Sequence, residues 1–204
     1  HTPLDIEGFD FLRDVGFPGQ YPFTSAAFPV NLVPAIKKGA KPGGLKRASQ
    51  YSGYGTPEDT RDYYKAQAAL GWSGGPNFAL DLPTQCGYDS DNPAVEGEVG
   101  KVGVAIDSLR DFEVIFEAFT GDNDLDKIAT NITMNAAANI MIAMYIALAE
   151  KRGIPMSKLR GTPQNDILKE HVSRGTYIFP PKPSMRMFRD SVVFFTKNLP
   201  GINI

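Results

Sequence analysis

Residues 56–204 alternate between short segments of strand length and longer segments with apolar residues at helical spacing. Two apolar runs, 77–82 and 128–134, have the length of buried strands. A third strand is predicted at 161–164, where it ends in polar residues, and a fourth begins at 202–204. Because strands that alternate with helices are typical of parallel βα units, we expect an α/β fold with about three such units.

Helix start signals mark the segments between these strands. Thr56 is a suitable N-cap, Pro57 fits the first helical position, and the two acidic residues that follow suit the positive helix end. This pattern predicts a helix that runs to about Leu70. Further helices are predicted from Ser108, over 136–150, over 166–173 and from Ser184. Residues 83–93 are expected to form a loop after the first strand, where α/β proteins often carry functional residues.

The first 55 residues lack such periodicity. Aromatic residues recur between Gly and Pro, which predicts an extended arm packed on a surface. A Gly-rich basic patch follows at 37–47. We interpret it either as a solvated loop or as a cationic loop that meets phosphate groups, and its spacing does not decide between the two.

Composition argues against several classes of function. The chain has 204 residues and a formal net charge of −2, which disfavours a nucleic-acid or anionic-membrane surface. The single cysteine, Cys86, allows no intrachain disulfide and indicates a reducing cytoplasm. Two histidines cannot build a His-rich metal cage. The longest apolar run, 136–149, is shorter than the ~20 residues that span a bilayer, so it predicts a buried helix and not a membrane span.

Residues 161–166 are small and polar, although apolar runs flank them. Thr162, Gln164, Asn165 and Asp166 are poor core material, because a buried polar group costs free energy unless it finds a partner. We therefore interpret these residues as groups collected at a site, at the end of the third strand.

Seven ordered segments carry a specific resemblance that covers residues 2–204. They read TPLDIEGFDFLRDVGFPG, QYSGYGTPEDTRDYY, LDLPTQCGYDSDNP, GEVGKVGVAIDS, TMNAAA, GTPQNDILKE and RGTYIFPPKPSMR. Together they resemble the large, barrel-bearing subunit of the adenosylcobalamin-dependent acyl-CoA mutases, the family of methylmalonyl-CoA mutase. The resemblance implies a TIM (β/α)8 barrel threaded by coenzyme A, with the corrinoid lying across the C-terminal face of the strands.

On this resemblance, the chain is expected to be the N-terminal part of such a barrel. Residues 1–55 form the extended arm and basic loop, and 56–204 form a partial barrel that binds the acyl-CoA substrate. A closed barrel takes roughly 250 residues. The family's fourth-strand Tyr-His pair and its cobalt-ligating DxHxxG motif are not found, so the cobalt ligand is expected elsewhere. Expected partners are the rest of the barrel, a cobalamin-binding domain or subunit, and a second copy in a dimer.

Two residues match family positions beside the substrate. Tyr51 matches a tyrosine between corrinoid and substrate, where it would wedge the adenosyl group and hydrogen-bond the substrate. Arg174 matches the arginine that pairs with the free carboxylate of methylmalonyl or succinyl through a two-pronged, charge-assisted hydrogen bond. Without the resemblance, Tyr51 is an ordinary half-buried tyrosine and Arg174 a surface arginine.

Further matches lie at the ends of the three predicted strands. The residues expected to line the substrate are Asn131, Thr133, Thr162 and Gln164, and those expected to face the corrinoid are Leu80, Leu82 and Gln85. Among them, Gln164 would hydrogen-bond the thioester region. For the four substrate-lining residues, local capping or turn bonding is the alternative interpretation.

The sequence departs from the family pattern at several positions. Ser49 stands where an arginine is usual, Gln85 where a histidine is common and Cys86 where an arginine is common. We interpret Cys86 as a small loop residue and not a nucleophile, because no base is identifiable beside it. Segment 28–45, which helps to grip the CoA phosphates in the family, shows little of the usual pattern. Ala79 stands where hydroxyisobutyryl-type enzymes place an aspartate.

The predicted function is the adenosylcobalamin-dependent rearrangement of methylmalonyl-CoA to succinyl-CoA, or of a close 2-substituted acyl-CoA. Tyr51 and Arg174 together suit an acyl chain that ends in a carboxylate. Two alternatives stay open at this point. One is a mutase for isobutyryl-CoA-type substrates, and the other is a non-catalytic module for subunit binding and assembly.

Overall fold

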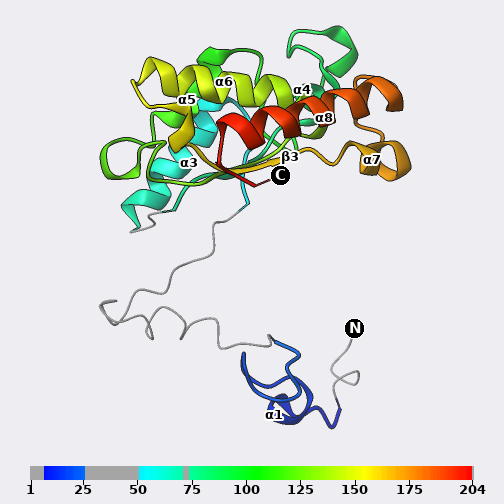
Figure 1. Cartoon of the computed structure of the whole chain (residues 1–204). Helices are drawn as coiled ribbons and strands as arrows, with labels where there is room; N and C mark the ends of the chain where they lie inside the picture. The colour runs from blue at the N-terminus through cyan, green and yellow to red at the C-terminus, as the bar shows by residue number, and fades with distance from the viewer. Residues whose placement is uncertain (1–6, 26–50, 71–73, 204) are drawn as a thin grey trace. The chain divides into compact units, whose positions relative to one another are not determined.

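The computed structural model of the chain describes residues 7–25, 51–70 and 74–203 (Figure 1). The chain divides into two compact units, residues 1–48 and 49–204. In the first unit, α1 (Phe11–Asp14) is a single turn whose N-cap Asp10 accepts a hydrogen bond from the Arg13 backbone N–H at 2.8 Å. The basic patch predicted at 37–47 lies outside the described residues.

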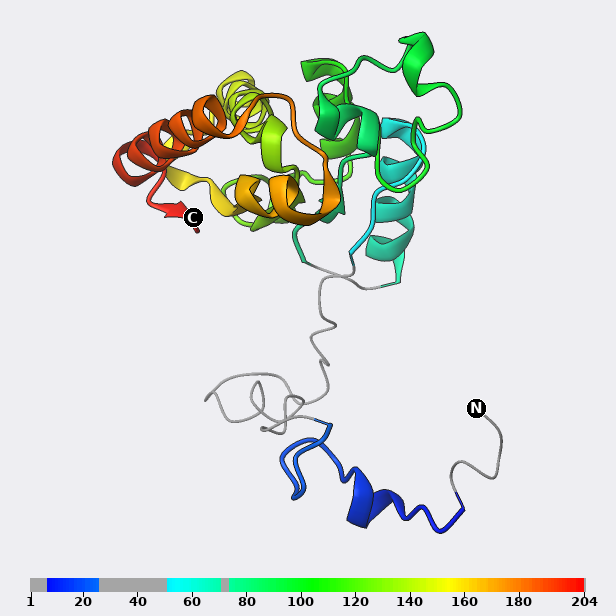
Figure 2. The same ribbon diagram turned by 90° about the vertical axis from the view of Figure 1, so that its right-hand side faces the viewer.

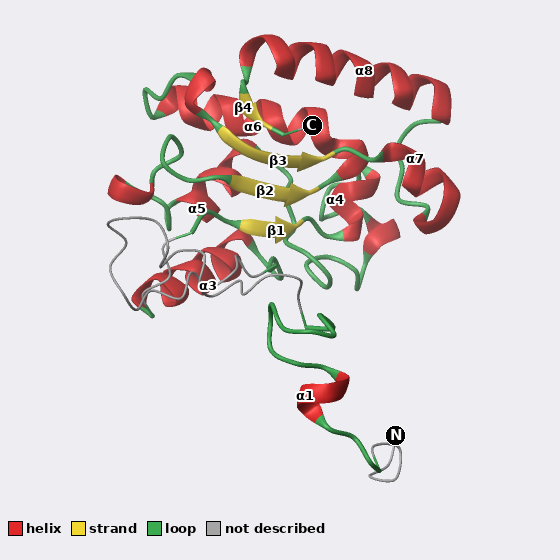
Figure 3. Ribbon diagram, turned by 60° about the horizontal axis from the view of Figure 1, so that its bottom comes forward, coloured by secondary structure: helices red, strands yellow, loops and turns green. Residues whose placement is uncertain are grey.

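The second unit is built on a parallel sheet with the strand order β1-β2-β3-β4 (Figure 3). Its strands are β1 (Asn77–Ala79), β2 (Thr130–Thr133), β3 (Arg160–Gln164) and β4 (Gly201–Ile202). Isolated parallel bridges from Ser52 to Phe78 and from Val104 to Leu80 extend the pairing beyond β1. The predicted α/β fold with parallel βα units is therefore confirmed over these four strands.

Helices follow the strands in the predicted alternation. They are α3 (Pro57–Ala69), α4 (Leu82–Cys86), α5 (Leu109–Phe116), α6 (Ala138–Lys151), α7 (Ile167–Lys169) and α8 (Pro181–Asn198). Short single-turn helices complete the unit: η2 (Pro93–Val95), η3 (Gly121–Asn123), η4 (Asn135–Ala137), η5 (Met156–Lys158) and the π-helical η6 (Glu170–Arg174). The predicted start at Thr56 is confirmed, because Thr56 and Asp59 form a reciprocal capping box.

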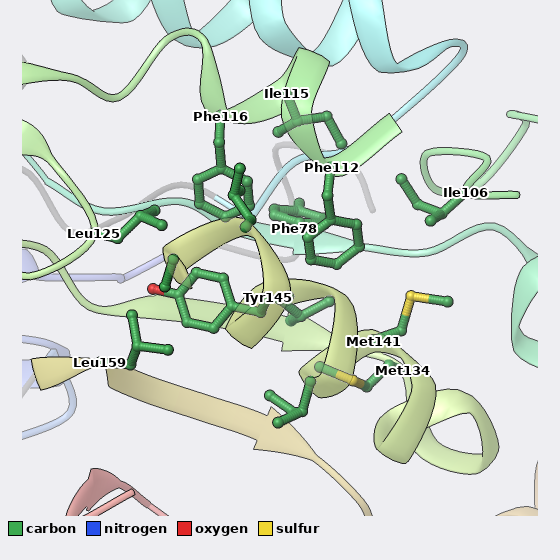
Figure 4. Packing of buried hydrophobic residues seen from close by; sticks show 14 of the residues in the cluster. Phe78, Ile106, Phe112, Ile115, Phe116, Leu125, Met134, Met141, Tyr145 and Leu159 are labelled. Atoms are coloured by element: carbon green, nitrogen blue, oxygen red, sulfur yellow. The ribbon is translucent and has the colours of Figure 1, made fainter. Parts of the chain in front are cut away.

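Aromatic and aliphatic side chains pack together in the core between the sheet and the helices (Figure 4). Phe78 of β1 packs edge-on against Phe112 and Phe116 of α5, with ring centroids 6.5 and 6.4 Å apart. The Tyr145 hydroxyl of α6 lies 3.0 Å from the Thr130 hydroxyl, so its polar end is satisfied. Burial raises the pKa of Tyr145 to about 12. These contacts fix the sheet against α5 and α6, and so fix the ends of its strands.

Strands β1 and β2 are shorter than the apolar runs that predict them, and two helices begin where the sequence prediction has no helix start. The expected loop at 83–93 begins as helix α4, because Asp81 accepts a hydrogen bond from the Thr84 backbone N–H at 3.0 Å and Pro83 fits the first turn. The last helix begins at Pro181 and not at Ser184. Its first turn accommodates prolines, since the first backbone N–H groups of a helix need no intrahelical partner.

The two faces of the sheet differ in their covering. Helices α5, α6 and α8 lie on one face (Figure 1), and Phe78 and Ile132 point into the core on that side. Side chains alternate along a strand, so Asn131 and Thr133 of β2 point to the other face. Figure 3 looks onto that face, where no helix of the described residues covers the strands.

Candidate functional site

The open face of the sheet carries two adjacent rows of residues, which are polar except for the buried Ala79. Strand register places Asn77, Asn131 and Thr162 side by side in the first row. In the second row it places Ala79, Thr133 and Gln164 side by side. The four predicted substrate-lining residues are thus brought together on one surface.

Two residues of this surface were missed by the sequence interpretation. Asn77 belongs to the first row, and the Asn203 side chain joins it by donating a hydrogen bond to the Thr162 hydroxyl at 3.3 Å. The sequence does carry a signal for Asn77. Side chains alternate between the two faces of a strand, so the apolar Phe78 and Leu80 indicate the buried face and Asn77 belongs to the other face. Asn203 gave no such signal, because its place depends on the pairing of β4 with β3.

A buried carboxylate organises the carboxyl ends of the strands. Glu170 in η6 is 1% exposed. It accepts hydrogen bonds from the Asn135 side-chain amide after β2, from the Thr176 hydroxyl and from the Thr176 backbone N–H. Arg174 donates from Nε to Oε2 at 3.0 Å and from Nη2 to Oε1 at 2.7 Å. Figure 2 looks onto this end of the sheet, where α7 and η6 lie.

A second contact ties Arg174 to the end of β1. Its Nη2 also donates to Oε1 of Gln85 in α4 at 2.6 Å. Gln85 is buried, and its Nε2 donates to the Leu80 carbonyl at 2.6 Å. Gln85, Asn135 and Glu170 therefore connect segments that follow β1, β2 and β3 in turn. We call the five side chains of Gln85, Asn135, Glu170, Arg174 and Thr176 the strand-end network.

The charge balance within this network keeps Glu170 ionised. Burial alone raises the pKa of a carboxyl group, but hydrogen bonds from Arg174 and Thr176 outweigh burial here and hold the pKa of Glu170 below its usual range. Asn135 adopts a left-handed backbone conformation with φ of 39°, and its Oδ1 accepts the Asp166 backbone N–H at 3.2 Å. Strained backbone of this kind persists only where its surroundings hold it.

The remaining predicted residues lie around this network without joining it. Tyr51 is 60% exposed and directly precedes Ser52, whose backbone N–H donates to the Asn77 carbonyl at 2.9 Å. Leu80 is fully buried in the core, and Leu82 is partly buried at the start of α4. Tyr51 therefore stands level with β1, while Arg174 stands beyond the carboxyl end of the sheet.

A cavity of about 360 Å³ opens beside the end of β3. Its walls are Thr162–Leu168 on one side and Met185, Phe188 and Phe195 of α8 on the other. The Gln164 Oε1 atom is buried and has no hydrogen-bond partner among the described residues. An amide carbonyl left in this state favours a ligand that donates a hydrogen bond.

Cys86 ends α4 next to the strand-end network, and burial raises the pKa of its thiol, with the Glu170 carboxylate raising it further. Because the thiolate is the reactive form, iodoacetamide should alkylate Cys86 several-fold more slowly at pH 7.5 in the folded protein than in urea. Mass spectrometry over a time course measures both rates on the same single thiol. Equal rates would show that Cys86 is not protected in this way.

Comparison with known proteins gives consistent matches, each of which covers three quarters or more of the chain. The family profile described as methylmalonyl-CoA mutase matches residues 1–204. The methylmalonyl-CoA mutase large subunit of Streptomyces virginiae is 41% identical over 203 residues, which cover 100% of this chain and 26% of that protein. The chain belongs to the methylmalonyl-CoA mutase family.

Other members of the methylmalonyl-CoA mutase family differ in their named substrates. The 2-hydroxyisobutanoyl-CoA mutase large subunit of Aquincola tertiaricarbonis is 43% identical over 203 residues, covering 100% of this chain and 34% of that protein. The ethylmalonyl-CoA mutase of Methylorubrum extorquens is 44% identical over 153 residues, covering 75% of this chain and 22% of that protein. The chain thus spans about a quarter to a third of the length of these relatives.

Two further structural findings concern the described residues alone. None of their helices is both long enough and apolar enough to cross a membrane. Within the same residues, no three side chains of His, Cys, Asp or Glu are grouped so that they could hold a metal ion.

Proposed function

We propose that the protein is an adenosylcobalamin-dependent mutase for an acyl-CoA with a free carboxylate, such as methylmalonyl-CoA or a close 2-substituted relative. The observation that carries this proposal is Arg174, which the strand-end network holds at the carboxyl end of a parallel sheet. Its Nη1 has no hydrogen-bond partner among the described residues. Substrates of open α/β sheets bind at this end of the strands.

The second row of the open face bears on the choice of substrate. Ala79 lies beside Thr133 and, through it, in line with Gln164. The resemblance places an aspartate at this position in hydroxyisobutyryl-type enzymes, where a carboxylate can accept a hydrogen bond from a substrate hydroxyl. The methyl group of Ala79 offers no such acceptor, which supports an alkyl-substituted substrate here.

Four polar residues of the open face have a role in this proposal. Gln164 meets the thioester region, whose carbonyl oxygen can accept a hydrogen bond from the Gln164 amide N–H groups. Asn131, Thr133 and Thr162 line the path of the acyl-CoA with uncharged hydrogen-bonding groups. Because none of them is an acid or base at neutral pH, they hold a reactive substrate without protonating it.

The residues present fit a large planar cofactor only in part. Leu80 is enclosed in the core and both polar ends of the Gln85 amide are engaged, so neither offers a free group. Leu82, which is partly buried, and Tyr51, which is exposed, keep surface to contact a corrin ring. When bound, adenosylcobalamin supplies the radical that removes a hydrogen atom from the substrate. Tyr51 would hydrogen-bond the substrate and separate it from the cofactor.

The larger assembly follows from the same proposal. The parallel sheet would form part of an eight-stranded barrel that encloses the acyl-CoA and excludes water from it. A cobalamin-binding domain or subunit would supply the cobalt ligand, and two copies of the protein would form a dimer in the cytoplasm.

Replacing Arg174 with lysine should test the carboxylate-binding role. Lysine keeps the positive charge but loses the planar fork, so kcat/KM for methylmalonyl-CoA should fall roughly 10- to 100-fold, the value of a hydrogen bond to a charged group. Steady-state assays of the cobalamin-loaded enzyme measure the change. Arg160→Lys, at the opposite end of β3, is the matched control and should leave kcat/KM unchanged. A fully active Arg174→Lys enzyme would contradict the proposal.

A further inference from the structure

The free hydrogen-bonding capacity of Arg174 is limited to one nitrogen. A guanidinium group has five N–H donors. Glu170 takes the donor on Nε and one on Nη2, and Gln85 takes the other on Nη2. The two donors on Nη1 have no partner in the described part of the chain. Because the Arg174 side chain is 38% exposed, a ligand can reach it.

Both partners of Arg174 are themselves held in place. Glu170 is fixed by the Asn135 amide and by Thr176, and it is enclosed by protein. Gln85 is fixed by its bond to the Leu80 carbonyl at 2.6 Å. Arg174 is attached to η6, after β3, but its head group is held by Gln85, which follows β1, and by Glu170, which Asn135 fixes from the end of β2.

We propose that Glu170 and Gln85 are positioning residues, which hold Arg174 with Nη1 presented to the carboxylate of the substrate. This inference rests on the proposed function, since it assumes that Arg174 binds that carboxylate. An unrestrained arginine loses side-chain freedom when it binds a ligand, and a group fixed beforehand does not. Glu170 also compensates the arginine charge, so the guanidinium is not left as an unpaired ion in the empty site.

The inference predicts that selectivity for the carboxylate depends on residues that do not touch the substrate. We define selectivity as the ratio of the dissociation constants of isobutyryl-CoA and methylmalonyl-CoA, which differ by one carboxylate. Isothermal titration calorimetry of the protein with each compound gives this ratio without any catalytic turnover. Glu170→Gln keeps the side-chain shape but removes the negative charge. It also replaces one acceptor oxygen with an NH2 group, which cannot accept a hydrogen bond from the guanidinium. Gln85→Leu removes the second anchor.

Both variants should lower the selectivity about tenfold, which corresponds to the loss of one charge-assisted hydrogen bond. Ser173→Ala is the matched control, because it removes a hydrogen bond of the same segment, to the Lys169 carbonyl, and leaves both partners of Arg174 and their anchors in place. It should keep the selectivity of the unaltered protein. Circular dichroism confirms that each variant is folded, and if Glu170→Gln does not fold, Gln85→Leu decides the outcome.

The possible failures of the experiment are distinguishable. If the unaltered protein shows carboxylate selectivity and Arg174→Lys reduces it, but Glu170→Gln and Gln85→Leu do not, the positioning role is wrong and the proposed function stands. If the unaltered protein shows no selectivity, or if Arg174→Lys leaves it intact, the proposed function is overturned and the positioning role falls with it.

Discussion

Replacing Glu170 with alanine should lower the free energy of unfolding by about 3 kcal/mol, the lower end of the cost of breaking a buried ion pair, because Glu170 is buried but the Arg174 side chain is 38% exposed. The substitution leaves the Arg174 guanidinium uncompensated and deprives Asn135 and Thr176 of their acceptor. Urea unfolding followed by circular dichroism measures the change. Thr176→Val, which removes one donor and no charge, should cost about 1 kcal/mol. Equal, small losses in both variants would show that the carboxylate does not organise this region.

The same carboxylate gives this prediction a dependence on pH. Its pKa is lowered in the folded protein, so its contribution to stability is fully present above the unfolded value of about 4.3. That contribution is lost as the pH falls through the lower, folded pKa. The stability difference between the unaltered protein and Glu170→Ala should therefore shrink in acid, and a difference that grows in acid would contradict the assignment.

Replacing Gly161 with alanine should be comparably damaging, for a steric reason. A Cβ atom at residue 161 would lie 1.8 Å from the Thr130 carbonyl oxygen, which is backbone of the neighbouring strand β2 and cannot rotate away. The two strands must move apart, and we expect a loss of about 3 kcal/mol or more. Thermal and urea unfolding measure it.

Gly153→Ala is the matched control for this substitution. Gly153 has a φ of +69°, but a Cβ there meets nothing within 4 Å. Its replacement should cost only about 1 kcal/mol, the penalty for placing an L-residue in the left-handed region. If both alanine variants lose the same stability, the close approach of β3 to β2 is not what requires Gly161.

Local sequence signals predict the strands and most helices. The sequence also carries a start signal for helix α4, where a loop is predicted. Asp81, followed by Leu82 and Pro83, carries a helix start pattern similar to that of Thr56 followed by Pro57. The apolar run before it ends in Leu82, which favoured extending the strand to that residue. In the structure, β1 ends at Ala79, three residues earlier, and Asp81 caps α4.

The candidate site was predictable only where it follows from strand alternation. Asn131, Thr133, Thr162 and Gln164 lie near predicted strand ends, so their shared face follows once the strands are parallel and in register. The partners of Arg174 were not predictable in this way. Glu170 stands four residues before it, a spacing that many surface ion pairs share, and Gln85 is 89 positions away. That contact depends on the whole sheet being assembled.

The strand-end network contains two hydrogen bonds between residues that are far apart in the sequence. The bond between Asn135 and Glu170 joins residues 35 positions apart, and the bond between Gln85 and Arg174 joins residues 89 positions apart. The segment from α7 to η6 therefore cannot open locally without breaking bonds to both of the preceding βα units. Amide hydrogen exchange in the α7–η6 segment and in the two preceding βα units should therefore occur through one shared opening event. The least stable of the three is then protected from exchange to the same degree as the other two.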